Sequence, residues 1–267
     1  MNQDGIRRIV AVIVSPFVIG CGTDNVDSSG AEDPSTTVSV DQISLALNWY
    51  PESEHGGYIA AQELGLFETA GIDVEIKPGG PGAPNLVIQE LAAGTIDFAV
   101  SNADLVVLAR SKGVDLVALA APLQQSPRCI LVHEESGIEK LEDLRDVQLA
   151  ISDSRPFALW MKKKLPLSNV TMVPFSGQVG EFLLNDDFAQ QGYVFSEPFI
   201  VAEKGGKARS LMLSDIGFNP YASLLVTRAE MIDKDPDLVR RTVHACVVGW
   251  QKYLESPEVF CQTDPKL

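Results

Sequence analysis

Short apolar segments with the period of a strand alternate with segments that have the period of a helix along this chain. In its first half this pattern predicts strands over 38–47, 72–76, 96–100 and 116–121, and helices over 57–65, 86–93 and 104–111. Alternation of this kind is typical of α/β folds, in which helices cover a mainly parallel sheet. We therefore predict an α/β fold for this half.

The pattern is interrupted around Pro122 to Arg128 and then resumes. The sequence predicts further strands over 129–133, 148–151, 170–174, 192–195 and 208–212, with helices over 157–164, 179–184 and 198–203. A last strand is predicted over 221–227, followed by helices over 229–232 and 237–254. The 267 residues suffice for one large or two medium domains, and we predict a second α/β unit over about 128–215.

The N-terminal segment is predicted to be a targeting sequence. Arg7 and Arg8 precede an apolar run, which ends in Val18-Ile19-Gly20-Cys21. That ending resembles a bacterial lipobox, which implies that residues 1–20 are a lipoprotein signal peptide and that Cys21 is lipidated. An ordinary signal peptide with a chance cysteine is the alternative. The polar residues up to 39 are predicted to be a flexible tether, so we expect a protein of the periplasm or cell envelope, anchored to the membrane by lipid.

The overall charge and the cysteines exclude several classes of function. The net charge is −15 and the sequence pI about 4.6, which argues against nucleic acid or an anionic membrane surface as a partner. The remaining cysteines, Cys129, Cys246 and Cys261, match no metal-binding spacing. We predict no metal site, and the pairing of Cys246 with Cys261 stays open.

Polar and aromatic residues crowd into the stretch from Ala46 to Tyr58. It starts as an apolar strand, breaks at Pro51 and resumes as a helix near Gly57. Open α/β sheets bind their ligands at such strand ends. A surface loop with a half-buried tryptophan is the alternative interpretation.

This stretch and four later motifs resemble the solute-binding proteins of ABC importers that handle thiamine-precursor pyrimidines, sulfonates, nitrate and riboflavin. The resemblance covers roughly residues 40–255. It is carried by Asn48-Trp49 with His55-Gly56-Gly57-Tyr58, by Gly65-x-Phe67-x-x-x-Gly71-Ile72-x-Val74, by Gly94-Thr95-Ile96-Asp97-Phe98, by Leu141-Glu142-Asp143-Leu144 and by Ser196-Glu197-Pro198.

The resemblance implies a type II periplasmic-binding-protein fold, with two α/β lobes joined by two crossing strands. Lobe 1 would comprise 40–123 and 220–267, and lobe 2 would comprise 124–219. The implied partners are a small-molecule solute and an ABC permease in the inner membrane, and the protein is expected to be a monomer. The family usually continues for some tens of residues beyond the helix that contains Trp250, so we expect a shortened first lobe.

In the first lobe, Trp49 is the first candidate ligand contact, because an indole can stack on a planar heteroaromatic solute. Asn48 offers a donor and an acceptor to an aminopyrimidine edge. His55 and Tyr58 are further candidates, with a surface position and a packing role as their alternatives. Ser101 and Asn102 follow a predicted strand and precede a helix, which places them towards the cleft.

In the second lobe, Ser152, Ser154 and Arg155 occupy a strand-to-helix corner, where an arginine and hydroxyl groups can hold an anion. Glu197 is predicted to accept from an amino group or to pair with a protonated ring nitrogen. A pyrimidine ligand would depend on Trp49, Asn48 and Glu197. A sulfonate or nitrate would depend on Arg155 and Ser154, and a riboflavin-like solute is a further alternative.

The rival hypothesis is an enzyme, because fungal pyrimidine-precursor synthases resemble this fold. They use a lysine that carries pyridoxal phosphate and a donor histidine. Aligned on Gly94-x-x-Asp97, those places hold Ser101 and Leu105 here, and neither can do that chemistry. We therefore predict a binding protein without catalytic residues or a cofactor.

Overall fold

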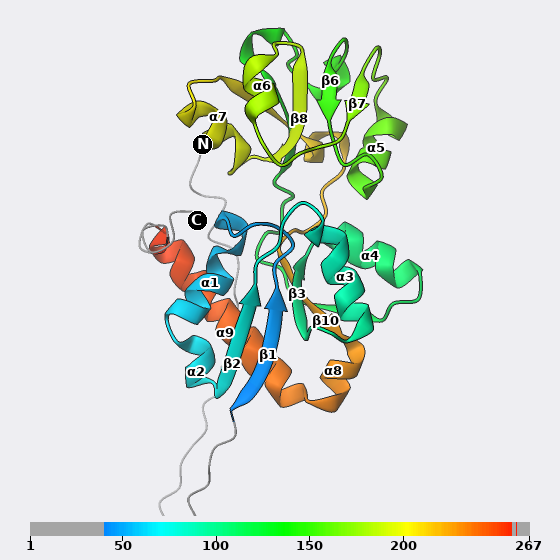
Figure 1. The fold of residues 1–267 in the computed structure, drawn as a ribbon. Helices are drawn as coiled ribbons and strands as arrows, with labels where there is room; N and C mark the ends of the chain where they lie inside the picture. The colour runs from blue at the N-terminus through cyan, green and yellow to red at the C-terminus, as the bar shows by residue number, and fades with distance from the viewer. Residues whose placement is uncertain (1–39, 258–259, 261–267) are drawn as a thin grey trace, which may run out of the picture. The chain divides into compact units, whose positions relative to one another are not determined.

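The computed structural model describes residues 40–257 and 260, and these form two five-stranded sheets (Figure 1). The first sheet has the order β2-β1-β3-β10-β4, with bounds β1 Asp41–Ala46, β2 Ile72–Lys77, β3 Phe98–Ser101, β4 Leu116–Ala120 and β10 Leu224–Arg228. The second has the order β7-β6-β8-β5-β9, with bounds β5 Arg128–His133, β6 Gln148–Ala150, β7 Thr171–Val173, β8 Phe188–Tyr193 and β9 Ala208–Met212.

The helices lie between these strands along the chain. The α-helices are α1 Gly56–Glu63, α2 Leu66–Thr69, α3 Ala83–Ala93, α4 Ala103–Ser111, α5 Pro156–Lys164, α6 Gly180–Leu184, α7 Glu197–Glu203, α8 Ala229–Lys234 and α9 Pro236–Glu255. The 3₁₀ turns are η2 Ser53–His55, η3 Glu134–Ser136, η4 Leu141–Asp143 and η5 Leu213–Ile216. No described helix is long and apolar enough to cross a membrane.

Each sheet carries one antiparallel strand inside an otherwise parallel set. β1 pairs in parallel with β2 and β3, while β10 pairs antiparallel with β3 and β4. In the second sheet β6 pairs in parallel with β7 and β8, and β5 pairs antiparallel with β8 and β9. The chain leaves the first sheet after β4 and returns to it at β10, and a bridge between Leu123 and Ala222 joins the two connections.

Alternating side chains of the strands supply a core on each face of each sheet. Ile43 and Leu45 of β1 pack with α1, α2 and α9 on one face, whereas Ala46 packs with α3 and α4 on the other. Ala189 of β8 packs with α5, and Phe188 packs with α6 and α7. This period of two is what a pleated strand covered on both faces requires.

Two glycines allow α1 and α9 to approach closely. A Cβ on Gly249 would lie 2.3 Å from the carbonyl oxygen of Gly57, and a Cβ on Gly57 would lie 2.1 Å from the Trp250 ring. Trp250 is 8% exposed, as a core residue should be. The start of α9 is also well defined, since Pro236 is its first residue and the Asp235 carboxylate accepts from Leu238 N at 2.9 Å.

Three details of the predicted elements are wrong. The helix expected over 86–93 begins earlier, at Ala83, with Pro84 in its first turn. The strand expected over 192–195 is β8, which ends at Tyr193; it contains the buried amides Gln190 and Gln191, which mask its apolar pattern. The helix expected over 57–65 ends at Glu63, and Gly65, with φ 64°, separates this helix, α1, from the short helix α2. The signal peptide, the tether, Cys21 and Cys261 lie outside the described residues.

Candidate functional site

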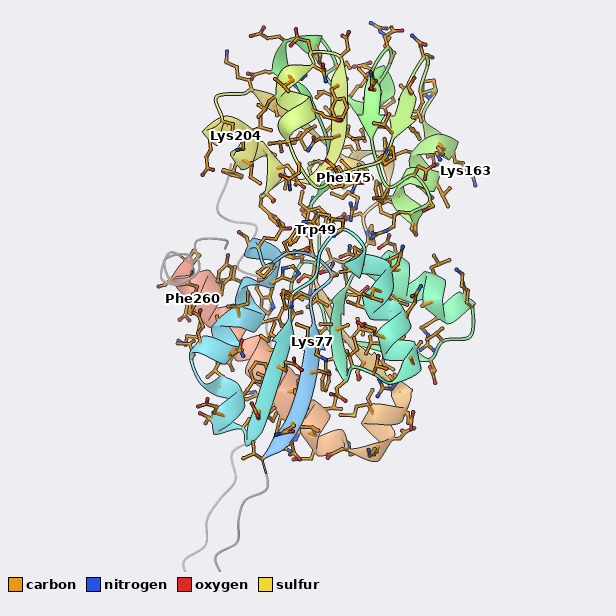
Figure 2. All side chains as sticks on the ribbon, viewed as in Figure 1. Trp49, Lys77, Lys163, Phe175, Lys204 and Phe260 are labelled. Carbon is orange, nitrogen blue, oxygen red and sulfur yellow. The ribbon has the colours of Figure 1, made fainter. Side chains whose placement is uncertain are left out.

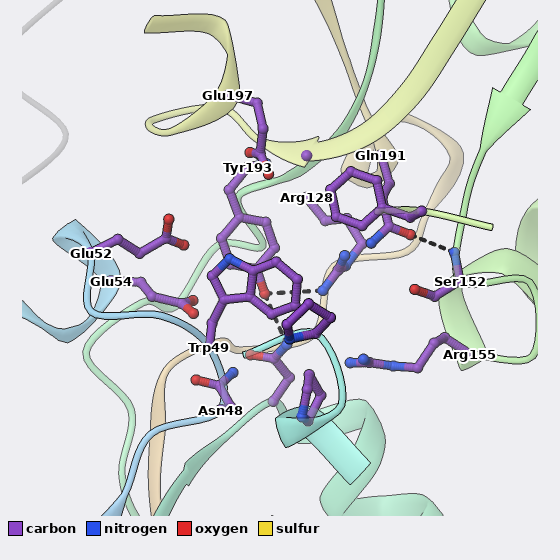
Figure 3. Close-up of a pocket in the computed structure, with 15 residues that line it drawn as sticks. Asn48, Trp49, Glu52, Glu54, Arg128, Ser152, Arg155, Gln191, Tyr193 and Glu197 are labelled. Carbon is purple, nitrogen blue, oxygen red and sulfur yellow. Dashed lines mark hydrogen bonds between the residues drawn. The ribbon is translucent and has the colours of Figure 1, made fainter. Parts of the chain in front are cut away.

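A cavity lies between the two sheets, where polar loops leave the strand ends (Figure 3). It is lined by Asn48, Trp49, Glu52, Glu54, Pro81, Pro84, Asn102, Arg128, Ser152, Arg155, Phe175, Gln191, Gly192, Tyr193 and Glu197. The centre of a water molecule can move through about 60 Å³ of it. The carboxyl ends of β1, β3, β6, β7 and β8 meet there, the position at which open α/β sheets bind ligands.

Two aromatic rings face each other across this cavity. Trp49 follows β1 and Phe175 follows β7, and their ring centroids are 6.2 Å apart with 15° between the planes (Figure 2). Gly177, with φ 79°, also approaches the indole, since a Cβ there would lie 3.2 Å from it. The two sheets therefore contribute opposite walls of one aromatic slot.

The backbone at Trp49 is held by the loop that precedes α3. Gly79 N donates to Trp49 O at 3.0 Å, and a Cβ on Gly79 would lie 2.3 Å from Leu47 O. Only a glycine allows that approach, so Gly79 positions the tryptophan.

Three carboxyl groups gather on one side of the cavity (Figure 3). Burial, and then the charge of Glu197, raises the pKa of Glu52 to about 7, although a hydrogen bond from Ser196 opposes the shift. Burial raises the pKa of Glu54 well above its ordinary value, and Glu52 adds to that shift. Burial also raises the pKa of Glu197, whose Oε2 accepts from Tyr193 N at 2.7 Å. Burial thus shifts each of these acids towards its protonated, neutral form.

Two guanidinium groups lie on the other side (Figure 3). Arg128 is 8% exposed and lies over the rings of Phe157 and Tyr193, at 4.2 and 4.8 Å from their centroids. Burial, followed by repulsion from Arg128, lowers the pKa of Arg155 to about 10, so Arg155 stays charged at neutral pH.

Two hydrogen bonds join the lobes beside the cavity. Ser196 Oγ donates to Glu52 Oε2 at 2.9 Å, and Asn102 Nδ2 donates to the Tyr193 hydroxyl at 2.9 Å. The Asn102 amide is oriented by a second hydrogen bond: its Oδ1 accepts from Ser223 N at 3.3 Å, which directs Nδ2 towards Tyr193. The residues of the cavity wall are therefore bonded to each other across the cleft.

Six residues predicted from the sequence line this cavity: Asn48, Trp49, Asn102, Ser152, Arg155 and Glu197. That they bind a ligand stays a prediction. Ser154 is exposed and lines a separate groove between α4 and the start of α5.

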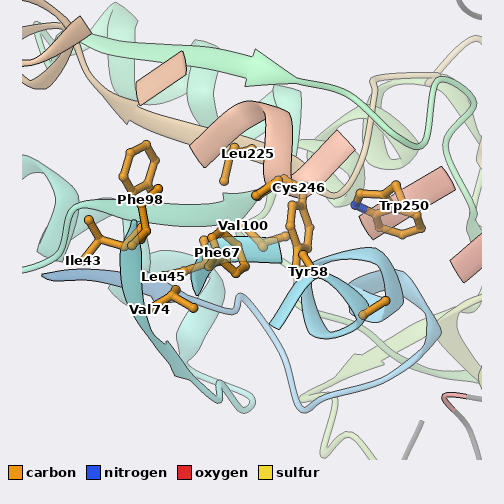
Figure 4. Close-up of a cluster of buried hydrophobic side chains, with 14 of the residues drawn as sticks. Ile43, Leu45, Tyr58, Phe67, Val74, Phe98, Val100, Leu225, Cys246 and Trp250 are labelled. Carbon is orange, nitrogen blue, oxygen red and sulfur yellow. The ribbon is translucent and has the colours of Figure 1, made fainter. Parts of the chain in front are cut away.

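The other three predicted residues lie behind the wall. Tyr58 is fully buried in the core beneath α9, and its hydroxyl donates to Ser223 O at 2.6 Å (Figure 4). Ser101 is fully buried in β3. His55 is fully buried too; burial lowers its pKa to about 3, so its ring is neutral and Nε2 donates to Asn48 Oδ1 at 2.9 Å. Tyr58, Ser101 and His55 therefore do not line the cavity as expected. Tyr58 and Ser101 pack in the interior, and His55 orients Asn48.

Several residues of the cavity wall were not predicted as ligand contacts from the sequence. Glu52 and Glu54 belong to the polar stretch from Ala46 to Tyr58, and their carboxylates are the local signal that could have identified them. Arg128 begins β5 at the crossing between the lobes, Tyr193 ends β8, and Phe175 lies two residues after the end of β7. No local pattern marks those three, because their position depends on strands that are distant in the sequence.

Comparisons with known proteins agree with this architecture. A family profile described as NMT1/THI5 like matches residues 52–259. The formylaminopyrimidine-binding protein of Halalkalibacterium halodurans is 22% identical over 262 residues, which cover 95% of this chain and 75% of that protein. A 4-amino-5-hydroxymethyl-2-methylpyrimidine phosphate synthase of Legionella pneumophila is 29% identical, but the match covers only 39% of this chain and 32% of the synthase.

Among solved structures, the alkanesulfonate-binding protein SsuA from Xanthomonas axonopodis pv. citri, bound to MOPS, aligns with a TM-score of 0.63 at 16% identity. The alignment covers 85% of this chain and 80% of that one. A likeness at this identity concerns the fold, and it confirms the predicted two-lobe α/β fold of periplasmic binding proteins.

Proposed function

Since the chain belongs to the NMT1/THI5-like family, we propose that it is an extracytoplasmic solute-binding protein of an ABC importer. Its solute is a small heteroaromatic molecule, first of all a thiamine-precursor pyrimidine, held between the two lobes and delivered to a permease. The formylaminopyrimidine-binding relative, matched over most of its length, supports this class of solute.

The observation that carries the proposal is the aromatic slot formed by Trp49 and Phe175. Their rings are almost parallel, at a centroid distance of 6.2 Å. A planar ring sandwiched between two others needs planes about 7 Å apart, two contacts of about 3.5 Å each. Because Trp49 and Phe175 come from different lobes, separation of the lobes would open such a gap, and closure would place one flat ring against both faces.

The polar groups beside the slot suit the edge of an aminopyrimidine. Asn48 Oδ1 is occupied by His55, which leaves the Asn48 amide nitrogen as a donor towards a ring nitrogen. Glu54 Oε2 is buried without a partner, and Glu197 lies on the same side, so both are suited to accept from an amino group. The small cavity favours a single ring over a riboflavin-like solute.

Ser101 and Leu105, which stand where the synthases carry their lysine and histidine, also favour a binding protein over an enzyme. Ser101 is fully buried in β3, and Leu105 is buried in α4. Neither side chain can form a Schiff base or donate an imidazole. The match to the Legionella synthase covers only 39% of this chain and 32% of the synthase, which is too little to support synthase activity for this chain.

We place the protein outside the cytoplasm, as a monomer attached to the membrane through lipid on Cys21. The location and the lipid anchor rest on the N-terminal sequence, and the monomeric state is carried over from the family resemblance. Metabolic labelling with palmitate tests it: the label should disappear in Cys21→Ser, and a label that persists in that variant contradicts the lipid anchor.

The solute is tested by calorimetry and tryptophan fluorescence on the purified protein. We expect 4-amino-5-hydroxymethyl-2-methylpyrimidine or its formylamino relative to bind with heat release and to quench the tryptophan emission. Taurine, nitrate and riboflavin are the comparison solutes. Binding of one of these without any binding of the pyrimidines would refute the proposed solute.

A further inference from the structure

The two arginines of the cavity have no carboxylate partner. Neither Arg128 nor Arg155 takes part in any ion pair among the described residues. Buried charges in proteins are normally paired, because desolvation without a partner costs several kcal/mol. Two unpaired guanidinium groups that line one small cavity therefore require an explanation.

Arg128 is held rigidly in place. Its guanidinium lies over the rings of Phe157 and Tyr193, and its Nη2 donates to the Tyr193 hydroxyl at 3.1 Å. A guanidinium fixed in this way presents its remaining N–H groups in a constant direction and loses little side-chain entropy on binding.

The Tyr193 hydroxyl has a hydrogen to spare. Its oxygen accepts from Arg128 Nη2 and from Asn102 Nδ2, which occupies both lone pairs. The hydroxyl hydrogen is then available for a third group, and no acceptor for it exists among the described residues. Since Tyr193 lines the cavity, that donor is available to a solute.

Arg155 provides a further donor without an acceptor. Its Nε is buried and has no hydrogen-bond partner, and the side chain lines the same cavity from the start of α5. The three donor side chains come from different parts of the fold: Arg128 from β5, Tyr193 from β8 and Arg155 from the residue just before α5. The tertiary structure thus brings three donors and two positive charges together.

We propose that this side of the cavity binds an oxyanion substituent of the solute, so that the solute is an aromatic ring that bears a phosphate, sulfonate or carboxylate group. The inference deepens the proposed function and rests on it for the aromatic part. The ring occupies the slot between Trp49 and Phe175, and the acidic group compensates Arg128 and Arg155.

The carboxyl groups opposite do not oppose this charge. Burial raises the pKa of Glu52, Glu54 and Glu197, which shifts each of them towards its neutral form. This shift reduces the negative charge opposite Arg128 and Arg155, so an acidic group of the solute beside the arginines is repelled less.

The experiment compares 4-amino-5-hydroxymethyl-2-methylpyrimidine with its phosphate monoester by calorimetry on the full chain. We expect the ester to bind at least tenfold more tightly. In Arg155→Gln that preference should fall to less than twofold. Arg145→Gln, which removes one exposed arginine of the same lobe outside the cavity, is the matched control and should keep the preference.

Two results would overturn the inference: equal or tighter binding of the alcohol, or an ester preference that survives in Arg155→Gln. If neither pyrimidine binds, the proposed solute fails separately, and taurine, MOPS and inorganic phosphate become the probes. Binding of one of them that is weakened at least tenfold in Arg155→Gln but not in Arg145→Gln supports the oxyanion site. Absence of binding by all of them overturns it. Thermal melting shows whether each variant is folded.

Discussion

The segment between β1 and α1 has two halves that the sequence makes look alike and the structure uses differently. Asn48, Trp49, Glu52 and Glu54 face the cavity, whereas the half from His55 to Tyr58 is buried beneath α9. Both halves are rich in polar and aromatic groups. The difference shows that such crowding indicates a site but not which residues reach the solute.

The division has a mechanical consequence. The core holds the cavity-facing half in place, because His55 donates to Asn48 and Ser223 Oγ donates to the carbonyl of Glu54. Changes in the half that packs beneath α9 should therefore alter stability, and changes in the cavity-facing half should alter binding. The following predictions test this separation.

The largest effect is expected from Trp250→Ala in α9. This ring packs edge-on against Tyr58 at 5.6 Å and is 8% exposed. Truncation should lower the free energy of unfolding by about 3–5 kcal/mol, measured by urea denaturation. The folded fraction should bind solute with near-normal affinity. A loss of binding without a loss of stability would contradict the separation of the two halves.

Trp49→Ala should weaken solute binding by about 1–3 kcal/mol, the cost found when a base loses an aromatic stacking partner. The unfolding free energy should change far less than in Trp250→Ala, because the indole faces the cavity. Phe175→Ala should weaken binding in the same direction, since it forms the other wall. Phe199→Ala, 64% exposed and outside the cavity wall, is the control. Unchanged affinity in Trp49→Ala would show that the ring only packs.

The affinity should also depend on pH through Glu52. The cleft raises the pKa of this group from 4.5 to about 7, so the form with bonded lobes holds the proton more tightly than a solvated carboxyl does. Protonation therefore favours closure: the affinity should rise as the pH falls from about 7 towards 4.5 and level off below, by at most tenfold per pH unit for one proton.

Glu52→Gln should flatten the part of this profile that lies near pH 7. The dissociation constant is measured by fluorescence titration at several pH values for the wild type and for Glu52→Gln. The titration of the solute itself is measured separately. An affinity that rises with pH in the wild-type protein would reverse the proposed sign.

The smallest effect is expected from Ser196→Ala. Its hydroxyl bonds Glu52 across the lobes at 2.9 Å, and one such bond contributes about 0.5–1.5 kcal/mol. The affinity should fall a few-fold and the melting temperature should hardly change. Ser214→Ala, a serine of η5 in the same lobe and outside the cavity wall, serves as control. A Ser196→Ala variant that binds as tightly as the wild type would show that the lobes do not depend on this bond.

Parts of the site could be predicted because the relevant signals are local. A tryptophan directly after an apolar strand and Pro156 at the start of a helix both follow from neighbouring residues. Arg128 and Tyr193 could not be found in this way. They meet because β5 pairs with β8, which opposes Arg128 to Tyr193 across 65 residues of sequence.

What the sequence by itself determined was the α/β alternation, most of the helices and strands, and the region of the first lobe where a solute would meet the protein. Periodicity and turn chemistry depend on residues within a few positions of each other. The tertiary structure alone decided which side of that region is buried, because α9 packs on α1 from nearly 200 residues away. It also brought the two arginines together, since their distance depends on how separate strands are ordered in the second sheet.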